Sequence, residues 1–414
     1  MLFVYRSIIN FIVLISPIII LFRLLKKKED PIRFKEKFCI FSKKRVKGNL
    51  IWFHGASVGE ILSVIPLIEK LERKSEIKQI LITSNTLSSS KIISNLKLKK
   101  TIHQFFPIDT NYHSQKFLDY WNPSSAIFID SEIWPNMILN IKKRPMKLIL
   151  LNGRITKKSF NRWKRFTLTA KNLFQKFDIC LASNNETKKY LTFFKAKKIK
   201  YIGNLKFSQV ENETNKLNNK IKKYLKLKTI WCAASTHDTE ELLCATIHKK
   251  LKARYKNLLT IIIPRHIERK KIIINQLKKL NLNIHIHSSG GGVPNNTDIY
   301  LVDSYGKTKS FFKICKTVFL GGSMIEHGGQ NPIEAARYGC KILHGKNTWN
   351  FKEVYSLLNR YNVTDKIDNL NQMKNKLESI FDKKNTSKNI KNKIDKLGDK
   401  ILRTTLKEIK SFII

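Results

Sequence analysis

Residues 50–71 read LIWFHGASVGEILSVIPLIEKL, and this stretch decides the fold class. The apolar run Leu50–Phe53 is typical of a strand buried on both faces, and the small residues after it turn the chain. From Ile61 onward, apolar residues recur at the three- and four-residue spacing of a helix that packs one face on a core. A buried strand followed directly by such a helix is the basic unit of an α/β fold.

The same unit recurs along the chain. Further buried strands are expected at Ile80–Thr83, Ala126–Asp130, Leu148–Leu151 and Ile179–Ala182. A second series of strands is expected at Thr229–Ala234, Leu258–Ile263, Ile299–Val302, Val318–Leu320 and Lys341–Leu343. Strands that alternate with helices form parallel sheets with helices on both faces. The sequence therefore predicts two doubly wound, Rossmann-like domains.

The composition of the chain also predicts where these domains begin and end. The apolar residues 1–25 precede a first domain that we expect over residues 31–207. The polar segment 208–228, rich in Asn and Lys, is typical of an interdomain linker. Residues 229–414 are then expected to form the second domain. Two such halves would face a cleft at the carboxyl ends of both sheets.

The first 25 residues are predicted to attach the protein to a membrane. The stretch Ser7–Phe22 carries no charge and is slightly shorter than the roughly 17–25 residues that cross a bilayer. No small-residue cleavage site follows, which disfavours a removed signal peptide. Lys26-Lys27-Lys28 comes next, and positive charge beside a membrane segment favours the cytoplasmic side. A helix lying in the membrane interface and a buried core helix are the alternatives.

The chain is strongly basic, with 79 Lys and Arg against 31 Asp and Glu and a formal net charge of +48. This charge favours polyanionic partners such as phosphorylated substrates, anionic lipids or nucleic acid.

The six cysteines form no C-x-x-C pair, and no cluster has the spacing of metal ligands, so we expect no bound metal. The chain has no G-x-x-x-x-G-K-S/T loop, which argues against a P-loop ATPase.

Three positions in the first domain are candidates for chemistry. Glu60 follows a strand and a small-residue turn, so it is a candidate general base; alternatively, it only complements a helix dipole. Glu132 follows another strand end close to Trp134, and helix capping by Ser131 is the structural alternative there. Lys206 lies just before the linker, where its charge would offset negative charge on a leaving group.

The second domain carries segments that suit an anionic ligand. Arg265 follows Pro264 at a strand end, where a phosphate is expected. After the glycine turn Gly328-Gly329, Asn331 is expected to cap a helix and Pro332 to be its first residue. Backbone N–H groups exposed at a helix start bind anions, and Glu334 in the first turn is placed for ribose hydroxyls.

The order and spacing of these motifs resemble those of the 3-deoxy-D-manno-octulosonic acid (Kdo) transferases of lipid A biosynthesis, glycosyltransferase family 30. The resemblance covers nearly the whole chain. The matching segments are the N-terminal apolar run, His54–Glu60, Ser131–Asn136, Leu151–Arg154, Gly203–Phe207, Ala234–His237, Pro264–His266, Gly321–Ser323 and Gly329–Glu334.

The resemblance implies a GT-B fold and an activity. Members of the family transfer Kdo from CMP-Kdo to a lipid A precursor, lipid IVA, with inversion and without a metal, at the cytoplasmic face of the inner membrane. CMP-Kdo is then a co-substrate, and no cofactor is expected. The resemblance also implies Glu60 as the general base, and Glu132 and Lys206 as groups that stabilise the transition state.

The resemblance further implies which segments bind CMP. These are Pro264-Arg265, Tyr305-Gly306-Lys307 and Asn331-Pro332-Ile333-Glu334. The family usually has glutamate at the position of Lys307, so this sequence departs from the family pattern there and the resemblance does not define the role of Lys307. The expected partners are CMP-Kdo, a lipid A precursor and membrane lipids, with no nucleic acid.

Two other functions are consistent with parts of the sequence. The first is a different GT-B enzyme with a UDP-sugar donor, which competition by CMP but not by UDP would exclude. The second, from another class, is a basic nucleic-acid-binding protein. It is suggested by charge alone, because the chain lacks the aromatic signatures of RNA-binding modules.

Overall fold

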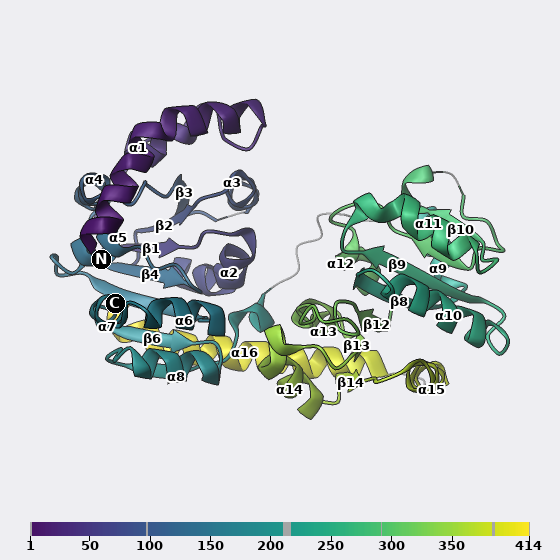
Figure 1. The fold of residues 1–414 in the computed structure, drawn as a ribbon. Helices are drawn as coiled ribbons and strands as arrows, with labels where there is room; N and C mark the ends of the chain where they lie inside the picture. The colour runs from purple at the N-terminus through teal and green to yellow at the C-terminus, as the bar shows by residue number, and fades with distance from the viewer. Residues whose placement is uncertain (1, 97, 210–216, 291, 383–385, 414) are drawn as a thin grey trace. The chain divides into compact units, whose positions relative to one another are not determined.

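The computed structural model describes residues 2–96, 98–209, 217–290, 292–382 and 386–413. The chain divides into two compact units (Figure 1). Unit 1 comprises Met1–Val210 together with Gly398–Ile414, and unit 2 comprises Glu211–Leu397. Each unit is built around a seven-stranded sheet, as expected from the repeated strand–helix pattern.

The sheet of unit 1 is parallel and has the strand order β3-β2-β1-β4-β5-β6-β7. Its strands are β1 (Leu50–His54), β2 (Gln79–Ser84), β3 (Thr101–Phe105), β4 (Ser125–Ile129), β5 (Lys147–Gly153), β6 (Ile179–Ala182) and β7 (Ile199–Tyr201). The order reverses between β1 and β4, and in doubly wound sheets ligands bind outside the carboxyl ends of the strands at such a switch point.

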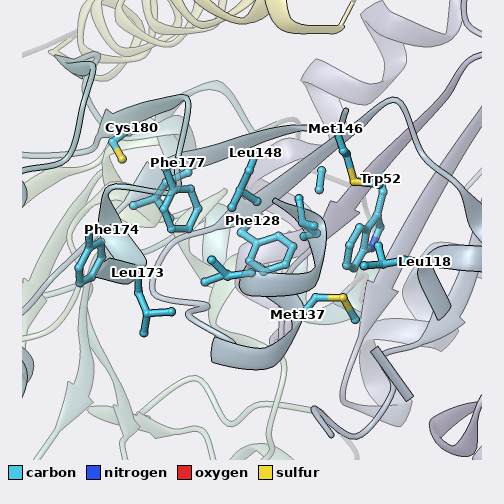
Figure 2. Packing of buried hydrophobic residues seen from close by; sticks show 14 of the residues in the cluster. Trp52, Leu118, Phe128, Met137, Met146, Leu148, Leu173, Phe174, Phe177 and Cys180 are labelled. Atoms are coloured by element: carbon cyan, nitrogen blue, oxygen red, sulfur yellow. The ribbon is translucent and has the colours of Figure 1, made fainter. Parts of the chain in front are cut away.

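The helices of unit 1 lie on both faces of its sheet (Figure 1). They are α1 (Leu2–Leu25), α2 (Val58–Glu72), α3 (Leu87–Ser94), α4 (Asn111–Trp121), α5 (Pro135–Ile141), α6 (Lys157–Lys164), α7 (Thr167–Phe174) and α8 (Asn185–Phe193), with the 3-10 turns η1 (Arg33–Phe38) and η2 (Leu205–Ser208). Figure 2 shows one core of this unit, in which Trp52, Phe128 and Leu148 pack with Phe174 and Phe177. Trp52 Nε1 donates a hydrogen bond to Thr83 Oγ1 at 2.9 Å, which satisfies the polar atom of this buried ring.

Unit 2 repeats the architecture with the parallel strand order β10-β11-β9-β8-β12-β13-β14. Its strands are β8 (Thr229–Thr236), β9 (Leu258–Pro264), β10 (Ile284–Ile286), β11 (Ile299–Leu301), β12 (Thr317–Leu320), β13 (Lys341–His344) and β14 (Thr364–Lys366). The helices are α9 (Asn219–Lys226), α10 (Glu240–Lys252), α11 (Lys270–Lys278), α12 (Thr308–Phe312), α13 (Ile333–Arg337), α14 (Lys352–Arg360) and α15 (Leu370–Phe381), with the 3-10 turns η3 (Ile267–Arg269), η4 (His287–Ser289) and η5 (Trp349–Phe351). Helix α16 (Thr386–Ile413) begins in unit 2 and belongs to unit 1 from Gly398 onward. The switch point of this sheet lies between β8 and β12.

Two features differ from the predicted domain boundaries. The segment 208–228, expected to be a linker, contains α9, and Leu225 of this helix is fully buried. The tail 398–414, expected in the second domain, belongs to unit 1. Its packing there is close: a Cβ on Gly398 would lie 2.5 Å from the Phe207 carbonyl oxygen. Asn49 Nδ2 also donates to the Ile413 carbonyl at 3.2 Å.

Candidate active site

Three predicted residues of unit 1 lie around one buried carboxyl group, that of Asp130. Asp130 follows β4 directly and has a positive φ of 60°. Its Oδ1 atom is buried and has no hydrogen-bond partner within the described part of the chain. Burial raises the pKa of Asp130 to about 6; Lys206 and Arg154 oppose this rise, whereas Glu60 and Glu132 add to it. The structure therefore brings Glu60, Glu132 and Lys206 within electrostatic reach of one point at the switch of the sheet.

Glu60 is held in the first turn of α2. Its Oε2 accepts a hydrogen bond from the Ala56 backbone N–H at 2.8 Å, and its Oε1 accepts one from the Ser57 hydroxyl at 2.7 Å. Ser57 is the N-cap residue, and its Oγ accepts a hydrogen bond from the Glu60 N–H in return. This reciprocal pair resembles a capping box, with the N–H of Ala56 in place of that of the N-cap residue. Glu60 is half-buried, and the space beside Gly59 is open, so the carboxylate has a structural partner and also access to solvent.

Glu132 is fixed over the end of β1. Its Oε2 accepts a hydrogen bond from Trp134 Nε1 at 2.9 Å and lies 3.3 Å from Nε2 of His54. His54 is fully buried, and its Nδ1 shares a hydrogen bond with Thr83 Oγ1 at 2.9 Å. The capping interpretation of Ser131 is wrong, because α5 begins at Pro135 with Trp134 as its N-cap residue.

Lys206 lies in η2, which packs against α2, the helix that carries Glu60. The turn is fixed by two asparagine side chains. Asn204 Oδ1 accepts a hydrogen bond from the Lys206 backbone N–H at 3.0 Å, and Asn152 Oδ1 accepts one from the Leu205 N–H at 2.9 Å. The Lys206 side chain is half-buried. A cation and two carboxylates therefore converge at the carboxyl edge of this sheet.

In unit 2, a buried carboxylate shapes the loop after β12. Glu240, at the start of α10, is fully buried. It accepts hydrogen bonds, at 2.7–3.1 Å, from the backbone N–H groups of His237, Gly322, Ser323 and Met324. Four donors satisfy both oxygens of the carboxylate, so the loop is held in one conformation.

The first position of this loop, Gly321, has no room for a side chain. A Cβ on Gly321 would lie 2.4 Å from the Ser235 carbonyl oxygen and 2.6 Å from Thr236 Cα. Gly322 has a φ of 65°, in the left-handed region that favours glycine. The two glycines therefore allow the ends of β8 and β12 to approach each other closely.

Three histidines and an arginine gather beside this loop. The His237 ring centroid lies 4.1 Å from that of His327 and 5.8 Å from that of His266. Burial, together with the neighbouring His327, His266, Arg265 and Arg269, lowers the pKa of His237 to about 4. Arg265 and the other two histidines are exposed. This arrangement is suited to bind an anion.

The segments predicted to bind a nucleotide include or neighbour Arg265. Pro264 is the last residue of β9, and Arg265 follows it. Tyr305 is exposed, and its hydroxyl donates to Glu268 Oε1 at 2.8 Å. Gly306 has a φ of 77°, and Lys307 is the N-cap residue of α12. Arg265 also lies within electrostatic reach of the Tyr305 hydroxyl.

The last predicted segment differs slightly from expectation. Helix α13 begins at Ile333, with Pro332 as its N-cap residue, one position later than predicted. Asn331 still contributes a cap, because its Oδ1 accepts a hydrogen bond from the Ile333 N–H at 3.2 Å. Glu334 Oε1 lies 3.3 Å from Lys309 Nζ, so an ion pair occupies the carboxylate that was predicted to bind ribose.

Three residues of these sites were not predicted. They are His54, Asp130 and Glu240. Asp130 was visible as a carboxylate directly after a strand, but its burial depends on the neighbouring strand ends. Glu240 stands beside Glu241 in a lysine-containing helix, a pattern typical of a solvated helix start. Among the described residues, no three His, Cys, Asp or Glu side chains are grouped to hold a metal ion.

Comparison with known proteins assigns the chain to a family. Residues 32–209 match the sequence model described as 3-Deoxy-D-manno-octulosonic-acid transferase (kdotransferase). Over 380 residues, the chain is 33% identical to the 3-deoxy-D-manno-octulosonic acid transferase of Rickettsia bellii, covering 91% of this chain and 89% of that protein. The chain belongs to the Kdo transferase family. The Haemophilus influenzae member is 30% identical over 315 residues, which cover 74% of this Kdo transferase and 73% of that protein.

Solved structures identify the fold of this Kdo transferase. A UDP-N-acetylglucosamine 2-epimerase matches with a TM-score of 0.58 at 11% identity, covering 89% of this chain and 97% of that one. A glycosyltransferase from Rickettsia africae matches with a TM-score of 0.56 at 13% identity, covering 89% and 99%. Together with the two parallel sheets, these matches confirm the predicted GT-B fold class. The family assignment makes the protein a glycosyltransferase.

Proposed function

We propose that this Kdo transferase moves Kdo from CMP-Kdo to lipid IVA, a lipid A precursor, with inversion and with Glu60 as the general base. The observation that carries the proposal is the convergence of Glu60, Glu132 and Lys206 around Asp130 at the switch point of unit 1. We further propose that the reaction needs no metal and no cofactor, with CMP-Kdo as a co-substrate. The chemistry then falls to these side chains.

Glu60 is proposed to take the proton from the acceptor hydroxyl. A sugar hydroxyl is a weak nucleophile until it loses that proton, and a positioned carboxylate removes it as the new bond forms. The hydrogen bonds from Ala56 and Ser57 orient the carboxylate before the acceptor arrives. Such preorganisation reduces the reorganisation that the reaction itself requires.

Glu132 and Lys206 are proposed to stabilise charge in the transition state. Glycosyl transfer passes through a state with positive, oxocarbenium-like charge on the donor sugar, which a nearby carboxylate stabilises. The hydrogen bond from Trp134 Nε1 holds the Glu132 carboxylate in place for this role. Lys206 supplies positive charge for the acidic donor and its phosphate.

The donor is proposed to bind unit 2 at the histidine and arginine side chains around His237. CMP-Kdo carries a phosphate and a carboxylate. The exposed Arg265 offers positive charge, and the exposed His266 and His327 offer ring N–H donors, beside the Gly321–Met324 loop. The segments Pro264-Arg265, Tyr305-Gly306-Lys307 and Asn331–Glu334 are proposed to bind CMP. For Glu334 this requires exchange of its Lys309 partner for the ribose.

The acceptor is a lipid, so the proposal includes a membrane. Helix α1 is long and apolar enough to anchor the protein in one. We propose that it attaches the enzyme to the cytoplasmic face of the inner membrane. The positive charge of the chain then serves anionic lipids and substrates rather than nucleic acid.

A transfer assay with the proposed donor and acceptor tests the proposed function. The full chain in lipid vesicles is mixed with CMP-Kdo and tetra-acylated lipid A precursor, and the products are analysed by mass spectrometry. A product heavier by one or more Kdo residues is expected. Transfer from a UDP-sugar instead, or protection of the protein by UDP rather than CMP, would contradict the donor assignment.

A further inference from the structure

The first turn of α1 is bound to a buried carboxylate of unit 1. The Tyr5 hydroxyl donates to Asp109 Oδ2 at 2.7 Å, and Arg6 Nε donates to Asn136 Oδ1 at 2.9 Å. Asp109 is fully buried and also accepts the backbone N–H groups of Asn136 (3.0 Å) and Met137 (2.8 Å). One carboxylate therefore holds the start of α1 and the start of α5 together.

The chain after α1 is also tied to unit 1. Glu29 is buried and accepts hydrogen bonds from Arg23 Nε at 2.9 Å and from Lys37 Nζ at 2.6 Å. Seven residues later, Glu36 Oε2 accepts a hydrogen bond at 2.8 Å from the backbone N–H of Phe105, the last residue of β3. Both ends of α1 are thus fixed on the same unit.

Between these two ends, α1 exposes a long apolar surface. Phe3 is 81% exposed, although it neighbours the bound first turn. The other exposed large apolar residues of the helix are Val4, Ile8, Phe11, Ile12, Leu14, Ile18, Ile19, Leu21, Phe22 and Leu25. Lys26-Lys27-Lys28 follows at the end of the helix, and Lys26 Nζ lies 4.2 Å from the Phe22 ring centroid. An apolar surface that ends in lysines matches a bilayer with anionic head groups.

The bound first turn conflicts with a helix that crosses the bilayer. Twenty-four residues of α-helix span about 36 Å, enough to cross a hydrocarbon core of about 30 Å. In a crossing helix, Tyr5 and Arg6 would lie on the far side of the membrane from unit 1. Their hydrogen bonds to Asp109 and Asn136 would then be impossible.

We infer that α1 is a strap that lies in one leaflet of the membrane, with its first turn clamped to Asp109 and Asn136 of unit 1. The inference rests on the proposed membrane attachment and specifies its topology. It also links the membrane to the candidate site, because Asn136 follows Glu132 by four residues and lies in the first turn of α5. The strap is therefore bonded to the helix that directly follows the Glu132 segment.

Topology is tested with a full chain that carries a polar protease site at each end. The protein is reconstituted in vesicles of phosphatidylethanolamine and phosphatidylglycerol, and protease is added outside. Because the C-terminal site reports the side on which unit 1 lies, the strap predicts equal cleavage of both sites in intact vesicles. Protection of the N-terminal site until detergent is added, with the C-terminal site cleaved, would overturn the inference. Failure of the protein to float with vesicles at all would instead refute membrane attachment.

The clamp itself is tested by Tyr5→Phe, which removes only the hydroxyl that donates to Asp109. The melting temperature of unit 1 in detergent should fall by a few degrees, since a buried carboxyl group loses a hydrogen-bond donor. The matched control is Tyr112→Phe, at an exposed tyrosine of α4, which should leave the melting temperature unchanged. Equal melting temperatures for both variants would show that the Tyr5 contact does not hold the strap.

Discussion

Glu240 Oε2 accepts the Gly322 backbone N–H at 2.7 Å, and this contact joins the start of α10 to the loop after β12. Glu240→Gln keeps the shape of the side chain but replaces one acceptor oxygen with an NH₂ group, which cannot accept hydrogen bonds from the backbone N–H groups it faces. Each buried donor left unpaired costs about 1–3 kcal/mol. We expect a lower melting temperature for unit 2 and weaker CMP binding, measured by calorimetry. Glu378→Gln, at a carboxylate paired with Lys374 on α15 of the same unit, is the control and should change neither value.

The low pKa of His237 predicts that CMP binding takes up a proton. The ring is neutral at pH 7, because its pKa lies at about 4. A phosphate bound beside it would raise that pKa, so the complex holds a proton that the free protein lacks. CMP affinity should therefore rise as the pH falls from 7 to 5.

Titration calorimetry at each pH checks this prediction. CMP has its own phosphate pKa near 6, so the pH dependence must be compared with that of His237→Gln. The variant should show the smaller change in affinity with pH. Identical pH dependence in the two proteins would mean that no anion binds beside His237.

Asp130 predicts a pH dependence of the stability of unit 1. Its pKa is raised from 3.8 to about 6 in the folded state, so the folded state binds the proton more tightly than the unfolded state does. Stability is therefore lost as the pH rises from about 4 to about 6. Asp130→Asn removes this loss, so the variant should gain stability relative to wild type between pH 5 and pH 7. A constant difference in unfolding free energy across that range would contradict the burial of this carboxyl group.

The sequence predicted the central strands of both sheets and failed at their edges. Four strands were not predicted: β3, β7, β10 and β14. All four are edge strands. Each of them carries polar residues, as in Thr364–Lys366, and β7, β10 and β14 are only three residues long. One side of an edge strand is not paired, so its residues need not be apolar. Buried central strands have continuous apolar runs, which is why they were found.

The part of the candidate site that lies at the ends of strands could be predicted from the sequence. Glu60 and Glu132 follow β1 and β4, which are adjacent in the sheet, so their proximity follows from the topology. The role of Glu240 was not predictable, because its four donors come from loops more than eighty residues away or from its own turn. The place of the tail 398–414 likewise depends on contacts distant in sequence, such as that of Gly398 with Phe207.

Deletion of residues 1–25 is expected to have two effects. Vesicle association should fall, and any remaining association should be lost at high salt, because exposed lysine charges are screened. Unit 1 should also lose stability, because Asp109 would lose the Tyr5 hydroxyl. Flotation of the truncated protein at low and high salt, with its melting temperature, measures both. Association that survives a high-salt wash would rule out α1 as the main membrane contact.

The reciprocal hydrogen bonds of Glu60 and Ser57 permit a clean separation of catalysis from stability. Ser57→Ala removes the cap and should cost about 0.5–2 kcal/mol of stability. It also removes one of the two hydrogen bonds that orient the Glu60 carboxylate but keeps the carboxylate and its bond from Ala56, so kcat should fall much less than in Glu60→Gln. Glu60→Gln does the converse: glutamine also serves in a capping box, but it cannot take up the proton. The two variants should therefore fail in different assays.

The most direct test of the proposed mechanism is the turnover number of Glu60→Gln with CMP-Kdo and the lipid A precursor. General-base catalysis contributes about 10²–10⁴-fold, so kcat should fall by at least about 10²-fold, with CMP affinity and melting temperature nearly unchanged. A variant that keeps near-wild-type kcat but loses stability would show that Glu60 only caps α2, and the proposed mechanism would be wrong.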